Sequence, residues 1–394
     1  MKVPCKSDLQ IEMEKLAQGS GSRWGLRSVQ YAGALRALAK IQWRDGFPED
    51  AERNLTAAIS IFDDHRETRA QDALQSRSEL GLVFESMGRN AEALPLLELA
   101  ISSFESLDVS LSPLVFRAMG MVYFSEERYE EAIDCFTQAN AWFREDFGNS
   151  FWRVIEIEAA IGRAYRRLKD YSSAEKHLLK SLDARRAARC EGGHDAGAGA
   201  LDDDATDLMY EIAELHLDFE ERSKCASFLE DCVQEISCEL GDDHYAASRF
   251  CHLLGIVREQ QGDFDAAEDA FKSALAIRME SVGEDQRRAA SNSAFALGGM
   301  YHDLGRFEEA ERMLLWAYTA RPRSGGFDRR LAEIQGYLGS TLRQLGQDAL
   351  AVPFLQSALE MFTAIDGEES KAVACCKRDL DAIHGSSGDP DASR

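Results

Sequence analysis

The chain has 394 residues, with 45 lysines and arginines against 69 aspartates and glutamates, and its formal net charge is −24. A chain this acidic is not expected to bind nucleic acid or an anionic membrane surface, because both require a basic face. No segment approaches the roughly 18 consecutive apolar residues of a membrane span, and residues 1–5 lack the apolar part of a secretory signal. We therefore expect a cytoplasmic protein that does not insert into a membrane.

The nine cysteines are scattered along the chain and form no C-x-x-C pair. An odd number of unpaired cysteines is typical of reduced thiols in an intracellular compartment. Cys225 and Cys232 lie on one expected helix, with Cys251 and His252 on the next, which allows either a zinc site or buried thiols. The spacing fits no standard zinc site, and buried cysteines are common, so we predict no metal.

The segments follow one another in a simple order. Residues 1–27 are predicted to form an N-terminal cap, with a short amphipathic helix at about 7–18 and a flexible joint after it. Residues 28–189 hold repeats one to four, and residues 190–206, rich in glycine and aspartate, are predicted to be a flexible insert. Residues 207–365 hold repeats five to eight, 366–385 a C-terminal capping helix, and 386–394 a disordered tail.

The repeats are visible as a recurring string. "LGGMYHDLGRFEEAERMLLWA" at 297–317 matches "MGMVYFSEERYEEAIDCFTQA" at 119–139 and the segment at 253–274. We align all eight repeats on the turn expected between their two helices, which places one turn residue in each repeat: Gly46, Gly88, Glu127, Lys169, Glu221, Gly262, Gly305 and Gly346. In this alignment repeat five is irregular, since Glu214 stands where six of the other repeats have glycine.

Small residues recur at fixed distances from each turn. An alanine stands five residues after every aligned turn, as at Ala132 and Ala310, and a glycine stands seven residues before six of them, as at Gly120 and Gly298. Two antiparallel helices can cross closely only where the residues at the crossing are small. Apolar residues flank these positions at helical spacing, so each hairpin must stack on its neighbours to bury them. The pattern predicts an all-α, right-handed solenoid of about eight helical hairpins.

This arrangement of small, large and aromatic residues resembles the tetratricopeptide repeat, over about residues 28–365. The period is near 42 residues rather than 34, and the connector "ELGDDHYAA" at 239–247 is similar to a linker of the kinesin light chain subfamily. The coiled coil that precedes the repeats in that subfamily is absent from this sequence. The resemblance implies a non-enzymatic protein that binds other proteins.

A second feature of the resemblance can be checked residue by residue. Some tetratricopeptide domains hold the C-terminal carboxylate of chaperones with five polar or basic residues spread over three successive repeats. In this chain Arg36 and Lys40 occupy the first two positions, but Glu79, Leu114 and Ala118 occupy the other three. The resemblance therefore implies that this carboxylate clamp is incomplete.

No arrangement of residues points to catalysis. The sequence has no Walker loop, no H-E-x-x-H motif and no G-x-S-x-G motif. An enzyme would need reactive groups that converge in one pocket. We therefore predict neither catalytic residues nor a cofactor.

The first helix of each hairpin is expected to line the inner face of the solenoid. Cations outnumber acids there in repeats one, three and four, although the whole chain is acidic. We predict that this face binds a partner segment that is acidic, phosphorylated or a free C-terminus, since arginine grips carboxylate and phosphate with two hydrogen bonds. The predicted contact residues are Arg36, Lys40, Arg44, Arg117, Arg163, Arg166, Arg167, Arg249, His252 and Asn292.

Two alternatives stay open at this point. The arginines could instead pair with acids of neighbouring helices and only solvate the face. The chain could also work as a structural subunit of a larger assembly or as a regulator that sequesters an enzyme, rather than as an adaptor. The sequence determines neither the partner nor the oligomeric state.

Overall fold

The computed structural model describes residues 6–107, 112–148, 151–190, 201, 203–280, 283–322 and 328–386. Over these ranges the chain forms 18 α-helices and no β-strand. The predicted all-α class is confirmed. The chain divides into two compact units, residues 1–199 and 200–394.

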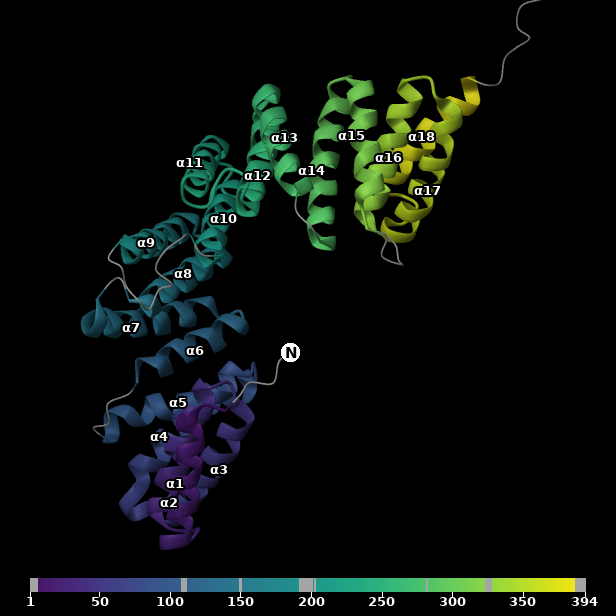
Figure 1. The fold of residues 1–394 in the computed structure, drawn as a ribbon. Helices are drawn as coiled ribbons and strands as arrows, with labels where there is room; N and C mark the ends of the chain where they lie inside the picture. The colour runs from purple at the N-terminus through teal and green to yellow at the C-terminus, as the bar shows by residue number, and fades with distance from the viewer. Residues whose placement is uncertain are drawn as a thin grey trace, which may run out of the picture. The chain divides into compact units, whose positions relative to one another are not determined.

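The first unit begins with a single helix, α1 (Asp8–Trp24), which packs on the first of four hairpins (Figure 1). In chain order the hairpin helices are α2 (Val29–Arg44) and α3 (Pro48–Asp64), α4 (Arg66–Ser86) and α5 (Asn90–Leu107), α6 (Pro113–Ser125) and α7 (Tyr129–Phe147), and α8 (Trp152–Arg167) and α9 (Tyr171–Cys190).

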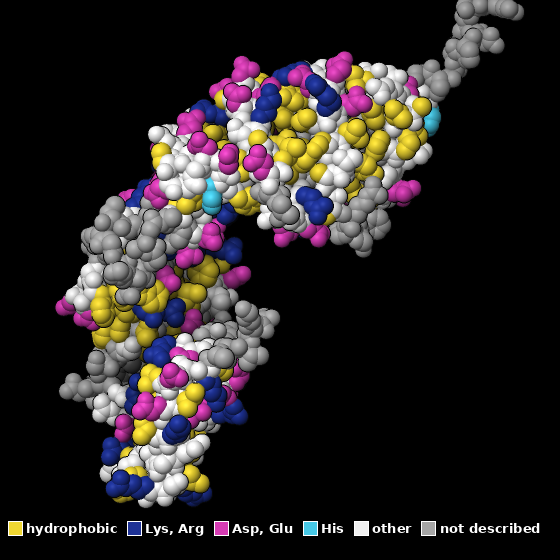
Figure 2. All heavy atoms as spheres, in the orientation of Figure 1, with side chains coloured by type: hydrophobic (Ala, Val, Ile, Leu, Met, Phe, Trp, Pro, Cys, Tyr) yellow, Lys and Arg dark blue, Asp and Glu magenta, His cyan; other side chains and the backbone are white. Residues whose placement is uncertain are grey.

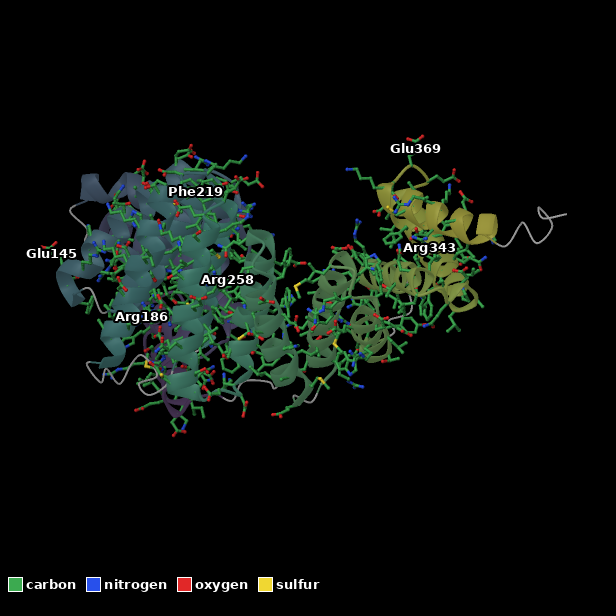
Figure 3. All side chains as sticks on the ribbon, turned by 90° about the horizontal axis from the view of Figure 1, so that it is seen from above. Glu145, Arg186, Phe219, Arg258, Arg343 and Glu369 are labelled. Carbon is green, nitrogen blue, oxygen red and sulfur yellow. The ribbon has the colours of Figure 1, made fainter. Side chains whose placement is uncertain are left out.

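The second unit holds four further hairpins and a final helix. They are α10 (Asp203–Asp218) and α11 (Arg222–Leu240), α12 (Tyr245–Gln261) and α13 (Phe264–Glu280), α14 (Glu284–Asp303) and α15 (Phe307–Ala320), α16 (Arg329–Gln344) and α17 (Asp348–Asp366), and α18 (Lys371–Ser386). On the face drawn in Figure 2, hydrophobic side chains gather over α14 to α17, and charged side chains border them. Glu369, in the turn before α18, points away from the helices in Figure 3.

Helix α1 is longer than the sequence predicted. It continues through Gly19–Ser22, where a flexible joint was expected, and ends at Trp24, which is followed by Gly25 with a positive φ of 88°. The reason is a packing contact with the next helix. A Cβ at Gly21 would lie 2.8 Å from Leu26 and 3.2 Å from Tyr31, so the glycine allows α1 to pack closely at this point.

The turns between paired helices lie where the alignment predicted in seven of the eight repeats. Each contains one residue in the left-handed region: Gly46, Gly88, Glu127, Lys169, Gly262, Gly305 and Gly346. In repeat five this residue is Glu220, with φ 58°, and not Glu221. The alignment of repeat five was therefore wrong by one residue.

The corrected register makes repeat five regular. Seven residues before Glu220 stands the fully buried Ala213, and five residues after it stands the fully buried Cys225. The Cys225 thiol donates to the Ala213 carbonyl oxygen at 3.3 Å, directly across the helix crossing. Cys225 and Cys232 therefore take the places that alanine holds in most other repeats, which gives these buried thiols a packing role.

Close helix crossings explain the glycines that recur seven residues before the turn. A Cβ added at Gly120 would lie 2.5 Å from the Phe136 ring, and one added at Gly298 would lie 2.8 Å from Leu314 Cγ. In both repeats the contacted side chain lies nine residues after the turn and is fully buried. The space that a side chain would need is thus filled by the partner helix of the same hairpin.

Parts of two predicted segments lie outside the described residues. For the insert expected at 190–206, these are residues 191–200 and 202, while α10 already begins at Asp203. For the tail expected at 386–394, they are residues 387–394.

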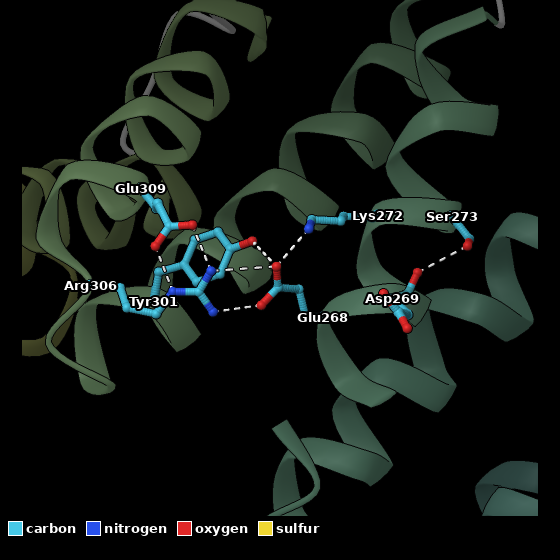
Figure 4. A network of polar contacts seen from close by, with 7 residues as sticks. All are labelled: Glu268, Asp269, Lys272, Ser273, Tyr301, Arg306 and Glu309. Atoms are coloured by element: carbon cyan, nitrogen blue, oxygen red, sulfur yellow. Dashed lines mark hydrogen bonds and ion pairs between the residues drawn. The ribbon is translucent and has the colours of Figure 1, made fainter. Parts of the chain in front are cut away.

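A polar network that joins neighbouring hairpins was not predicted. Arg306, in the turn of repeat seven, stacks on Tyr301 at 4.3 Å and forms ion pairs with Glu309 at 2.5 Å and with Glu268 of the preceding hairpin at 2.6 Å (Figure 4). Lys272 and Tyr301 also donate to Glu268. Arg306 therefore connects two hairpins with one guanidinium.

The same arrangement recurs in the first unit. Arg89, also one residue after its turn, lies over the Phe84 ring at 4.3 Å and pairs with Glu52 of the preceding hairpin and with Glu92. Arg128 lies over Tyr123 at 4.1 Å and pairs with Glu131. This contact thus has a sequence signature, counted from the turn residue with positive φ. The signature is an aromatic residue four positions before the turn residue, an arginine directly after it and an acid four positions after it.

We expect Arg306→Gln to lower the melting temperature more than Lys272→Gln does. Both variants remove a cation from Glu268, but Lys272 pairs with it inside one helix, whereas Arg306 joins two hairpins. Thermal unfolding followed by circular dichroism compares the two variants. Equal melting temperatures would show that the link between hairpins adds nothing to stability.

Candidate functional site

A pocket of about 420 Å³ opens on the side of the first unit that is formed by the first helices of its hairpins. We call this side, made by α2, α4, α6 and α8, the first-helix surface of the first unit. Residues of α2, α4 and α6 supply most of the pocket wall. Its apolar lining includes Leu74, Leu82, Val83, Leu114 and Val115.

Three cations from α2 lie at this pocket. Arg36, Lys40 and Arg44 are spaced by four residues, which places them on one side of the helix. The Lys40 and Arg44 side chains are 55% and 61% exposed, whereas Arg36 is mostly buried. The pocket therefore combines an apolar lining with a basic rim.

One acid in the pocket serves two of these cations. Glu79 accepts two hydrogen bonds from Arg36, both at 2.8 Å, and also pairs with Lys40 at 2.8 Å. Burial alone would lower the pKa of Arg36, but Glu79 and Asp72 outweigh it and raise that pKa. Arg44 pairs with Asp45 at 3.1 Å. Arg36 also pairs with Asp72 at 3.7 Å, so three acids face the three cations. Lys40 and Arg44 nevertheless keep more than half of their side-chain surface exposed to an incoming group.

The other predicted cations of the first unit do not reach this pocket. Arg117 on α6 donates to Glu85 at 3.4 Å, and burial raises the pKa of Glu85 although Arg117 opposes this shift. Arg163 and Arg166 on α8 both have polar or ionic contacts. Arg167 lies at the end of α8 and is exposed.

Helix α8 carries a buried carboxylate whose role was not predicted. Glu158 accepts hydrogen bonds from His177 at 2.8 Å, Lys180 at 3.0 Å and Asn140 at 2.7 Å, and it also pairs with Arg144. Burial alone would raise the pKa of Glu158, but the hydrogen bonds and the Arg144 charge outweigh it and lower the pKa to about 2. The cluster ties α7, α8 and α9 together.

The three predicted residues of the second unit lie at the first helices of its hairpins. Arg249 on α12 pairs with Asp207 at 2.6 Å and lies over the Tyr210 ring at 4.7 Å. Asn292 on α14 accepts a hydrogen bond from Arg321 at 3.0 Å. Asn292 and His252 line a second pocket, of about 260 Å³.

His252 is neutral near neutral pH. Burial, followed by the positive charges of Arg278 and Arg330, lowers the pKa of His252 to about 4. Its Nδ1 atom lies 3.3 Å from the Ser293 hydroxyl oxygen. This histidine can therefore take part in hydrogen bonding, but it does not add a positive charge to the surface.

The structure thus brings Arg36, Lys40 and Arg44 together in one pocket and His252 and Asn292 together in another. Four of the predicted cations pair with acids of neighbouring first helices, as expected if they only solvate this face: Arg36, Lys40, Arg117 and Arg249. The apolar pocket lining was not predicted, because its residues look like ordinary core positions in the sequence.

The described parts of the chain lack two kinds of feature. No group of three or more His, Cys, Asp or Glu side chains there is placed to hold a metal ion. No helix there is long and apolar enough to cross a membrane.

A comparison with curated protein sequences finds no significant match. The tetratricopeptide repeat family matches residues 112–187 and 246–323, one segment in each unit. Over these two segments the chain is built of tetratricopeptide repeats. Both matched segments span hairpins of the structure, α6–α9 in the first unit and α12–α15 in the second.

Solved structures of repeat proteins resemble the chain at low sequence identity. The C-terminal part of a TPR repeat-containing protein from Cytophaga hutchinsonii is 12% identical, with a TM-score of 0.51 over 76% of this chain and 97% of that one. BtubC (BKLC) from P. vanneervenii is 16% identical, with a TM-score of 0.49 over 62% and 94%.

A putative kinesin light chain with nearly identical TPR-like repeats, from Podosopora anserina, is 16% identical, with a TM-score of 0.41 over 52% of this chain and 95% of that one. The predicted tetratricopeptide repeats are confirmed, and kinesin light chain-type proteins are among the structures similar to this chain. At these identities the likeness is one of fold.

Proposed function

We propose that this tetratricopeptide repeat protein is a non-enzymatic adaptor, which binds an acidic segment of a partner protein on the first-helix surface of its first unit. Repeats of this fold are built for protein–protein interaction, because stacked hairpins present an extended surface. The observation that carries the proposal is the pocket whose apolar lining is rimmed by Arg36, Lys40 and Arg44. The chain as a whole is acidic, whereas three of the four charged residues that line this pocket are cations.

The chemistry of the pocket defines the partner segment. An aliphatic or aromatic side chain would enter the cavity between α2, α4 and α6, and an aspartate, a glutamate or a phosphorylated residue beside it would meet Lys40 and Arg44. Arginine can bind either group with two hydrogen bonds. Arg36, which Glu79 and Asp72 hold, would form part of the pocket wall.

The proposal places the protein in a reducing, cytoplasmic compartment. The cysteines of the described residues that have no disulfide partner include the buried Cys135, Cys225 and Cys376. Burial raises the pKa of each of these three thiols to about 11, which keeps them protonated and unreactive. Such thiols serve packing and do not require an oxidising environment.

The test is a peptide selection, which can be carried out without an identified partner. A displayed library of random peptides is selected on the full chain, and we expect the bound pool to be enriched in acidic residues next to a large apolar residue. Lys40→Glu/Arg44→Glu should weaken the selected peptides at least about tenfold, since it reverses the charge at the rim. Higher salt should weaken binding to the unchanged protein as well.

A matched control reverses two cations elsewhere on the same unit. Arg53 and Arg66 are exposed residues of α3 and α4 that do not line the pocket. Arg53→Glu/Arg66→Glu makes the same change in net charge and should bind the selected peptides like the unchanged protein. If both double variants weaken binding equally, the interaction depends on net charge alone and the pocket is not the site.

A second candidate, a structural subunit of a larger assembly, is favoured by one observation. Leu9, Leu16 and Trp24 on α1, with Leu26 after it, are exposed, although the end of a repeat array is usually polar. Leu16→Glu/Trp24→Glu should then release the chain from a stable complex in size-exclusion chromatography of a cell extract. An unchanged elution volume would contradict the subunit function, and the adaptor function would then be the one that remains.

A further inference from the structure

The first helices of the second unit carry two adjoining pockets. One, of about 260 Å³, lies between α12, α14 and α16, and the other, of about 330 Å³, lies between α14, α16, α17 and α18. Asp303 and Tyr337 line both of them, so the two pockets adjoin, and we call them together the second-unit groove. Contacts between α12 and α14, α14 and α16, and α16 and α18 hold its walls together.

Most charges along this groove are neutralised by neighbours. Glu333 pairs with Arg330 at 2.8 Å and with Arg329 at 3.4 Å. Asp379 pairs with Arg343, which Figure 3 labels among the C-terminal helices, at 3.3 Å. These pairs account for the acids at the α18 end of the groove.

Two carboxylates in the middle of the groove are different. Glu259 on α12 and Asp303 on α14 both line the pocket, and neither takes part in an ion pair within the part of the chain that the structure describes. Burial, together with the nearby Asp303 charge, raises the pKa of Glu259. Glu259 is partly buried and Asp303 is exposed, so a cation that enters the pocket could reach both carboxylates.

The walls around these acids suit the stem of a basic side chain. Tyr337 makes edge-on contacts with Phe295 at 5.6 Å and with His302 at 5.4 Å, which fixes its ring at the junction of the two pockets. Ile256 and Met300 complete the apolar lining. The aliphatic part of a lysine or arginine can lie on such a surface while an aromatic face and carboxylates receive its charged end.

We propose that the second-unit groove docks a partner segment through a lysine or arginine side chain, whose charge lies between Glu259 and Asp303 and whose stem packs on Tyr337. The occupant is a basic segment of another protein, and the groove selects it by the charge and the length of one side chain. An acidic segment is disfavoured at this point of the groove, because Glu259 and Asp303 are both negative and have no ion pair among the described residues. The inference concerns a different surface from the proposed function and extends it to a second, oppositely charged segment.

The test uses the same random-peptide selection on the full chain, and the selected peptides are now examined for a second, basic group. We expect a set of peptides that share a lysine or arginine, and replacement of that residue by alanine in the best peptide should weaken binding at least about tenfold. Glu259→Gln/Asp303→Asn, which keeps the size of both side chains, should weaken the basic peptide to a similar extent. It should leave the acidic peptides of the first unit unaffected.

Two comparisons separate this inference from its alternatives. Lys40→Glu/Arg44→Glu should leave the basic peptides bound, so that failure at one surface is distinguished from failure at the other. The melting temperature of Glu259→Gln/Asp303→Asn should equal or exceed that of the unchanged protein, since neither carboxylate takes part in an ion pair among the described residues that the change would break. Basic peptides that bind this variant as tightly as the unchanged protein, or a pool without basic peptides, would overturn the inference.

Discussion

Replacing Gly298 with leucine is expected to lower the free energy of unfolding by about 2–4 kcal/mol. The helix crossing leaves no room there, because even a single Cβ would lie 2.8 Å from Leu314 Cγ and 3.2 Å from the Leu314 backbone nitrogen. The side chain could shift, but the backbone atom belongs to the partner helix and moves only if the whole hairpin opens. Urea unfolding followed by circular dichroism would show the loss as a lower midpoint.

The adjacent glycine provides a control within the same helix. At Gly299 the nearest atom that a Cβ would meet is in the Tyr337 ring, at 3.8 Å, which is an ordinary contact distance. Gly299→Ala should therefore leave stability unchanged or raise it by up to about 1 kcal/mol, because alanine favours the helix. If Gly298→Leu unfolded at the same urea concentration as the unchanged protein, the register of the whole array would be wrong.

Removing the charge of Glu158 is expected to destabilise the first unit by about 3 kcal/mol. Glu158→Gln keeps the size of the side chain but leaves Arg144 and Lys180 without their shared carboxylate. The NH2 group of the glutamine would replace one carboxylate oxygen and would then face either His177 or Asn140, each of which now bonds a different oxygen. Thermal and urea unfolding at neutral pH measure the loss. Asp183→Asn, at a 73% exposed carboxylate of α9, should change stability little.

The pH dependence of this loss has a definite sign. The folded protein lowers the pKa of Glu158 from 4.5 to about 2, so the stabilisation is fully present above 4.5 and disappears as the pH falls through about 2. The difference in unfolding free energy between the unchanged protein and Glu158→Gln should therefore shrink over that range. A difference that stayed constant down to about pH 2 would mean that packing, rather than charge, accounts for the effect.

The two proposed surfaces differ in the sign of the charged groups that are available to a partner. In the first unit each cation at the pocket has an acid partner, but Lys40 and Arg44 remain more than half exposed and can reach an incoming acid. In the second unit the cations along the groove are paired and two carboxylates are left over. A partner with acidic and basic segments, or two partners of opposite charge, could engage this chain without competing for one surface.

The sequence alone determined the all-helical class, the eight hairpins and most of their registers. It could do so because small residues must recur where two helices cross, and because a turn residue with a positive φ stands at a fixed distance from them. Its prediction of cations on the first helices also identified Arg36, Lys40 and Arg44, which the structure places in one pocket.

The tertiary structure decided what a repeat pattern leaves ambiguous. In repeat five, Ala226 fitted the expected small position as well as Cys225 does, and only the backbone at Glu220 showed which of the two lies at the crossing. Whether a cation is neutralised depends on which acid the neighbouring hairpin brings within reach, as Glu79 does for Arg36 and Lys40. Such pairings join residues about 40 positions apart, so only the stacking of one hairpin on the next determines them.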